Sequence, residues 1–260
     1  MKINDYYRDA AHLNLNSSIA ALFLISILVA VNLSFFQNEI IFTLTIPFFL
    51  YSFFCFQLYL LRKRQAMTIN RNMGARWIKE KEQSFFSASH LLVLYDQTQG
   101  PSLHFYYPDG HLAGNIKKYH PKGVRKLNLT KFYILYNSNN KAIACFRVKG
   151  KKIEVFDKER IYLGCLKKTK LKWLKCTREL FDSKGNCIGS VVGSSIFMDE
   201  KLVDQENMQV LRLRRGWMPV EWSLLFPEPN TPVLSFSGKL SVQDKLLRMS
   251  FLINEYFMER

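Results

Sequence analysis

The sequence predicts a membrane-anchored, mainly β protein: an N-terminal transmembrane helical hairpin, an antiparallel sheet of about 12 strands and a C-terminal apolar helix. Three observations support this fold class. Residues 18–61 are almost wholly apolar, residues 85–236 alternate short apolar runs with turn signals, and residues 242–257 return to helical periodicity.

Two apolar runs, residues 18–36 and 40–61, are separated only by Gln37, Asn38 and Glu39, and neither run contains a charged residue. At about 1.5 Å per residue, each helix comes close to or exceeds the roughly 30 Å thickness of the hydrocarbon core. A cleaved signal peptide has a shorter apolar core, and a soluble hairpin would show a polar stripe that residues 51–61 lack. We therefore expect two transmembrane helices.

Basic residues follow the second run, beginning with Arg62, Lys63 and Arg64, whereas the intervening turn carries only Glu39. Because cytoplasmic flanks are enriched in Lys and Arg, this pattern predicts a cell-membrane protein with both termini in the cytoplasm. Residues 1–17 then form a cytoplasmic lead that is too short to fold. We expect residues 62–84 to form a basic juxtamembrane helix or linker lying on the leaflet, and residues 85–260 to form a cytoplasmic domain.

Short apolar or β-branched runs recur about every ten residues after Phe85, separated by turns such as residues 107–110 and 182–186. This spacing is typical of an antiparallel β-barrel or sandwich. The expected strands are residues 90–95, 103–107, 112–119, 132–136, 142–148, 153–156, 161–166, 176–181, 187–192, 210–213, 222–226 and 233–236.

The last element begins with a predicted capping box, in which Ser241 is followed three residues later by Asp244. Apolar residues cover most of the surface of the helix predicted over residues 242–257. This helix is too short and too charged to be a third membrane span, so we expect it inside a curved β-sheet.

Residues 180–189, LFDSKGNCIG, are similar to the repeated D-x-x-G-x-x-I-G units of the tubby C-terminal, phospholipid scramblase and LURP-one-related proteins. Residues 234–240, LSFSGKL, also resemble the run before the tubby core helix. The resemblance covers about residues 86–258 and implies a closed β-barrel enclosing the C-terminal helix. Scramblases place their membrane segment at the C-terminus, however, and no acidic calcium-binding run follows these strands. Tubby domains bind phosphoinositides through specific basic residues. No motif in this chain identifies the positions that would correspond to them.

The chain has a net charge of +16, and its positive excess lies entirely after residue 61, because Lys2 and Arg8 are outnumbered by Asp5, Asp9 and Glu39 in the first part. A strong positive field attracts nucleic acid or the anionic inner leaflet. Tethering beside a membrane favours anionic phospholipid over nucleic acid, although a Lys-rich surface can also serve solubility alone. The candidate lipid-binding residues are Arg62, Lys63, Arg64, Lys117, Lys118, Lys167, Lys168, Lys170, Lys172, Arg212, Arg214 and Arg215.

We therefore expect a non-enzymatic sensor, scaffold or regulator whose basic domain binds anionic headgroups or a membrane partner. One alternative is a protection or immunity protein that binds a membrane-active peptide, a toxin or a partner protein through its Phe-rich hairpin. Another is a lipid scramblase, which needs a polar path that the uncharged hairpin does not provide.

No nucleophile elbow, zinc-protease, P-loop or dinucleotide-binding motif occurs, so we expect no enzymatic activity and no cofactor. The five cysteines show no C-x-x-C pair, which argues against a metal site. His90, His104, His111 and His120 fall on neighbouring predicted hairpins near Asp109. They could form a metal or acid–base site, although such histidines are more often surface or strand-edge residues.

Overall fold

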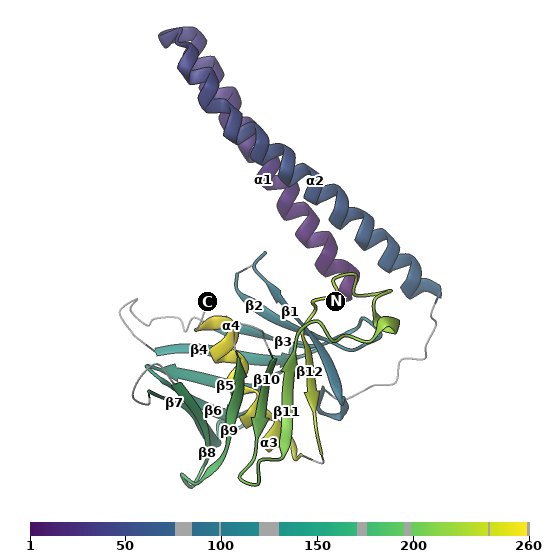
Figure 1. Cartoon of the computed structure of the whole chain (residues 1–260), viewed down its shortest axis with the longest axis vertical. Helices are drawn as coiled ribbons and strands as arrows, with labels where there is room; N and C mark the ends of the chain where they lie inside the picture. The colour runs from purple at the N-terminus through teal and green to yellow at the C-terminus, as the bar shows by residue number, and fades with distance from the viewer. Residues whose placement is uncertain are drawn as a thin grey trace. The chain divides into compact units, whose positions relative to one another are not determined.

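The computed structural model describes residues 1–75, 85–98, 100–119, 130–170, 176–194, 199–238 and 240–258. It contains two compact units, a helical hairpin within residues 2–77 and a β domain within residues 78–260 (Figure 1).

The hairpin consists of α1 (Ile3–Val31), a π-helical turn η1 (Asn32–Phe36) and α2 (Glu39–Ala75). The Asn32 side chain closes the turn between the two helices. Its amide donates to the Asn38 carbonyl and its oxygen accepts the Asn38 N–H, each at 3.0 Å. Asn32 is fully buried, so its polar groups are satisfied inside the hairpin.

Both helices contain an apolar stretch long enough to cross a membrane. Ser18 and Ser52 hydroxyl oxygens lie 2.9 Å apart across the two helices, and the Ser52 hydroxyl also donates to the Ser18 carbonyl at 3.1 Å. Small hydroxyl residues of this kind let helices approach closely and join them by hydrogen bonds where water is absent.

The first residues of the hairpin differ from the expectation. Residues 3–17 are helical, because α1 begins at Ile3 and packs beside α2 well before the apolar run starts; the Arg62 guanidinium lies over the Tyr7 ring at 5.4 Å. The first part of the basic segment is a helix, since α2 continues without a break to Ala75. The rest of this segment, residues 76–84, lies outside the described residues.

The β domain is a closed barrel of twelve antiparallel strands in which each strand pairs with its sequence neighbours and β1 pairs with β12. The strands are β1 (His90–Asp96), β2 (Ser102–Tyr106), β3 (Leu112–Tyr119), β4 (Thr130–Asn137), β5 (Ala142–Lys149), β6 (Lys152–Asp157), β7 (Tyr162–Lys170), β8 (Cys176–Asp182), β9 (Cys187–Ser194), β10 (Asp199–Val203), β11 (Gln209–Arg214) and β12 (Val233–Phe236). The predicted strands are confirmed except one.

Residues 222–226 do not form the expected strand. They follow a 3-10 helix, η3 (Val220–Trp222), and continue as a turn between Pro219 and Pro227. The strand that the sequence analysis missed is β10, whose sequence DEKLV lacks an apolar run because its inward-facing Glu200 carries a charge.

The hairpins at one end of the barrel share a turn geometry. Side chains of Asn137, Asp157, Asp182 and Asp204 each accept the backbone N–H groups two and four residues later, at 2.8–3.1 Å. The third residue after each has positive φ, which Gly and Asn tolerate best. This geometry explains the D-x-x-G part of the motif.

The glycine that ends the motif, Gly189, has a different role. A Cβ at this position would lie 2.3 Å from the Val203 carbonyl oxygen of β10, so only glycine allows the two backbones to approach.

The barrel encloses two short helices, α3 (Val242–Arg248) and α4 (Ser250–Phe257), which Figure 1 shows in yellow among the strands. The predicted cap is present, because the Ser241 hydroxyl accepts the Asp244 N–H at 3.1 Å. The single predicted helix is interrupted at Met249, next to which the Ser250 hydroxyl donates to the Leu247 carbonyl at 2.6 Å. Leu246, Met249 and Ile253 belong to one core with the inward-facing strand residues.

We predict that Leu246→Asp or Ile253→Asp unfolds the barrel, because each change places an unpaired carboxylate in the core. The penalty is comparable to the whole stability of a domain of this size, about 5–15 kcal/mol. Circular dichroism should show loss of the cooperative thermal transition. Val242→Asp is the control on the same helix, since Val242 is half exposed and its replacement should change stability by less than about 0.5 kcal/mol. A normal melt for both core variants would show that the helix does not support the barrel.

Candidate functional site

Barrel topology gathers basic residues at one end of the β domain. With consecutive antiparallel strands in a closed order, every odd-numbered strand ends, and every even-numbered strand begins, at the same end. We call this end the basic rim and define it by Lys117, Lys118, Lys131, Lys149, Lys151, Lys152, Lys167, Lys168, Arg212, Arg214 and Arg215. Strands that are far apart in the sequence thus contribute cations to one edge of the sheet.

The opposite end, which we call the turn rim, contains the hairpin turns with Asp109, Asp157, Asp182 and Asp204. These carboxylates accept backbone N–H groups, and the bonds from Asn186 in particular lower the pKa of Asp182. The turn rim also carries basic residues, including Lys141, Lys158 and Lys184, beside its carboxylates. Its charges are therefore mixed, whereas those of the basic rim are mostly positive.

Predicted lipid-binding residues of the β domain meet at the basic rim. Lys117, Lys118, Lys167 and Arg215 are exposed there, and Lys168, Arg212 and Arg214 are partly exposed. Lys170 is the last residue of β7, so its backbone lies at the basic rim. Lys172 lies outside the described residues. Lys149, Lys151 and Lys152 were not among the predicted residues, and strand pairing places Lys152 opposite both Lys149 and Lys167.

Some of these charges are neutralised locally. Arg212 donates to both carboxylate oxygens of Asp199 at 2.8 Å, which lowers the pKa of Asp199 and raises that of Arg212. Lys152 donates to Glu154 at 2.7 Å, and this bond raises the pKa of Lys152. The exposed side chains of Lys117, Lys118 and Lys149 therefore offer more accessible charge than Arg212 or Lys152.

The three remaining predicted residues belong to the hairpin unit. Arg62 stacks over Tyr7 and Lys63 donates to the Tyr59 hydroxyl at 3.2 Å, while Arg64 is exposed on α2. One contact between α1 and α2 and one within α2 thus hold two of these cations.

The predicted histidine group is not assembled. His90 bonds the Ser235 hydroxyl at 2.9 Å, His111 lies 3.3 Å from Asp109, and His120 is outside the described residues. No cluster of three His, Cys, Asp or Glu side chains suited to a metal occurs among the described residues. A pocket of 360 Å³ at the turn rim is lined by residues 87–90 and 107–109.

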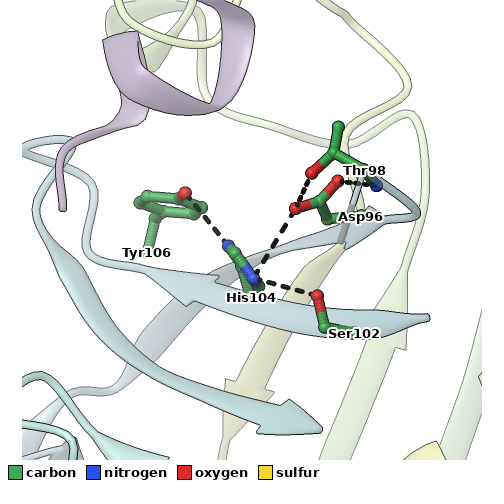
Figure 2. Close-up of polar contacts among 5 residues, drawn as sticks. All are labelled: Asp96, Thr98, Ser102, His104 and Tyr106. Atoms are coloured by element: carbon green, nitrogen blue, oxygen red, sulfur yellow. Dashed lines mark hydrogen bonds and ion pairs between the residues drawn. The ribbon is translucent and has the colours of Figure 1, made fainter. Parts of the chain in front are cut away.

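His104 lies in a separate polar cluster on the outer face of β1 and β2 (Figure 2). Alternation along β2 places Ser102, His104 and Tyr106 on this face, whereas Leu103 and Phe105 join the core. His104 Nε2 lies 3.1 Å from Ser102 Oγ and 4.0 Å from Asp96 Oδ2, and Nδ1 lies 3.4 Å from the Tyr106 hydroxyl.

Burial lowers the pKa of His104 to about 4; the Asp96 carboxylate opposes this shift and Lys117 adds to it. The imidazole is therefore neutral at neutral pH. Ser102 and Asp96 approach the same ring nitrogen, unlike a catalytic triad, in which the carboxylate orients the base from its other nitrogen. Asp96 is itself held by the Thr98 N–H and hydroxyl at 2.8 and 2.9 Å.

A second polar cluster lies inside the barrel and was not found from the sequence. Arg178 of β8 donates to Glu200 of β10 at 2.5 Å and to Glu255 of α4. All three residues are buried. The guanidinium thus joins two strands and the enclosed helix. Side chains alternate between the two faces of a strand, so Arg178 lies on the same face of β8 as the buried Leu180. This alternation is the feature of the sequence that could have indicated its burial.

Comparisons with known proteins do not assign a family. No family model and no curated protein matches the sequence. Among solved structures, the chain is similar to the X-ray structure of a protein from Arabidopsis thaliana, with 14% identity and a TM-score of 0.45. The similarity covers 66% of this chain and 91% of that chain.

We predict that the barrel loses stability below neutral pH because His104 is held neutral. The unfolded chain binds a proton with a pKa of about 6.5, whereas folded His104 does so only at about 4. Between these values the unfolded state binds more protons, so the free energy of unfolding falls as the pH falls. Urea denaturation should show that the free energy of unfolding falls by about 2 kcal/mol from pH 7 to pH 5.

The variant His104→Gln should reduce this fall, and the control variant His111→Gln should not. An unchanged pH dependence in His104→Gln would contradict the assignment.

We predict that Arg178→Met destabilises the barrel by about 3–5 kcal/mol, because it leaves Glu200 and Glu255 buried without their shared cation. Replacing all three residues with Met should recover most of the loss, since an apolar cluster carries no desolvation penalty. Thermal denaturation of the single and triple variants measures both effects. Equal melting of Arg178→Met and the wild type would show that the ion pairs are not needed.

Proposed function

We propose that the basic rim binds anionic phospholipid headgroups of the leaflet in which the α1–α2 hairpin is anchored. The protein would act as a non-enzymatic, membrane-tethered sensor, scaffold or regulator. The observation that carries this proposal is the collection of Lys and Arg from β3 to β7 and β11 at one end of the barrel. Basic residues near an anionic surface contribute about 1 kcal/mol each to binding.

The proposed topology places both termini and the barrel in the cytoplasm of a cell-membrane protein. It is supported by the apolar stretches of α1 and α2 and by the basic residues that follow the second one. The Ser18–Ser52 contact and the Asn32 bonds also suit a hairpin in hydrocarbon, because they satisfy its polar side chains internally. Anionic lipids of the inner leaflet would then lie within reach of the tethered domain.

We further propose that the β domain belongs to the tubby-like superfamily. The closed barrel around a C-terminal helix and the Asp182–Gly189 turn with its close Gly189 contact support this assignment. The proposed lipid binding rests on the rim itself, because a shared fold does not establish a shared function.

The proposal predicts that rim charge, rather than net charge, determines vesicle binding. The barrel fragment 85–260, first checked for a cooperative melt, is sedimented with phosphatidylcholine vesicles with and without phosphatidylserine. Lys117→Gln, Lys118→Gln and Lys149→Gln together should weaken binding to the anionic vesicles by about 3 kcal/mol, or about a hundredfold.

The matched control removes the same charge from the turn rim through Lys141→Gln, Lys158→Gln and Lys184→Gln, and it should bind nearly as the wild type does. Binding should also fall steeply as salt is raised. Equal losses in the two triple variants, or equal affinity of the wild type for neutral and anionic vesicles, would reject the proposal.

A further inference from the structure

The connection between β11 and β12 carries an unusual exposed apolar group. Trp217 is 65% exposed, Val220 is 81% exposed and Leu224 is 50% exposed. We call residues 217–224 the apolar loop. One residue, Gly216, separates it from Arg214 and Arg215 of the basic rim.

The exposure is imposed by local structure. Leu225 and Phe226, which follow the loop, are buried, and the Phe226 ring contacts Tyr106 of β2 at 6.3 Å between centroids. Within the loop, the Trp222 N–H donates to the Pro219 carbonyl at 3.1 Å and the Ser223 N–H to the Val220 carbonyl at 3.0 Å. Leu225 and Phe226 are therefore packed against the barrel, whereas the apolar side chains of the loop before them face outward.

A cation accompanies the exposed ring. The Arg214 guanidinium carbon lies 3.3 Å from the centre of the Trp217 ring, and Arg215 beside it is exposed. Trp at the headgroup level, aliphatic side chains below it and basic residues beside it are the composition of segments that bind membrane interfaces. A purely apolar protein partner would not match the adjoining positive charge, whereas an anionic leaflet matches both features.

We infer that the apolar loop inserts Trp217, Val220 and Leu224 into the headgroup–acyl boundary of an anionic leaflet. This inference rests on the proposed function: the basic rim supplies attraction to the surface, and the loop supplies burial of apolar area that salt does not screen. The loop would thereby fix one side of the barrel against the bilayer.

The test uses the full-length protein reconstituted into vesicles of phosphatidylcholine and phosphatidylserine with brominated acyl chains, which quench nearby Trp. Subtracting the fluorescence of Trp217→Phe from that of the wild type isolates Trp217 from the other three tryptophans. We expect brominated vesicles to remove most of the Trp217 signal. The double variant Val220→Asp, Leu224→Asp should lose this quenching, whereas Met208→Asp, which changes another exposed apolar residue at the turn rim, should retain it.

Acetylation of rim lysines in the same vesicles separates this inference from the proposed function. Slower acetylation of Lys117, Lys118 and Lys149 with phosphatidylserine than without it reports contact of the rim with headgroups. Rim protection without Trp217 quenching would overturn the loop insertion and leave the proposed function standing. Absence of both would overturn both, and quenching that persists in the double variant would reject insertion through Val220 and Leu224.

Discussion

A closed barrel of twelve strands is too wide to be filled by its own side chains, and the rest of the β domain depends on the helix that occupies it. About eight strands give an interior that side chains just fill. Four more strands leave room for α3 and α4, whose buried residues Leu246, Leu252 and Ile253 complete the core. Closure of the sheet and burial of α3 and α4 therefore support each other.

The enclosed helix also explains the polar interior. Lys245 of α3 donates to the Phe86 carbonyl before β1, and burial lowers the pKa of this lysine. Arg178 connects α4 to β8 and β10. Polar contacts near both helices thus supplement contacts that are otherwise apolar and non-directional. Gly164 permits the close fit, because a Cβ there would come within 2.2 Å of the Phe181 carbonyl oxygen and about 3 Å of the Leu247 side chain.

Local patterns predicted the fold well because most of its information is local. Apolar runs and turn signals located every strand except β10, and the capping box located the start of α3. β10 was missed because Glu200 faces inward, and residues 222–226 were assigned to a strand because their buried residues, Leu225 and Phe226, cover the outside of the barrel. The break between α3 and α4 at Met249 was not predicted, because the apolar periodicity runs through it without interruption.

The sequence predicted many residues of the candidate site but not that they lie together on one surface. The basic residues are spread along the sequence, and their common location follows from the antiparallel pairing of consecutive strands. The partners of Arg178, Glu200 and Glu255, come from a strand and a helix distant in sequence, so spacing along the chain could not reveal them. The partners of His104 lie within residues 96–106, and their contact depends on the pairing of β1 with β2.

Pairing of sequence neighbours around the whole sheet has a consequence for biosynthesis. During translation, the apolar hairpin and the first eleven strands leave the ribosome before β12 and the enclosed helix. Until those segments emerge, the nascent domain is an open meander with unpaired edges at β1 and β11 and an uncovered apolar inner face. Chaperone demand should therefore be concentrated late in synthesis, and chains interrupted before residue 233 should be preferred substrates for quality-control proteases.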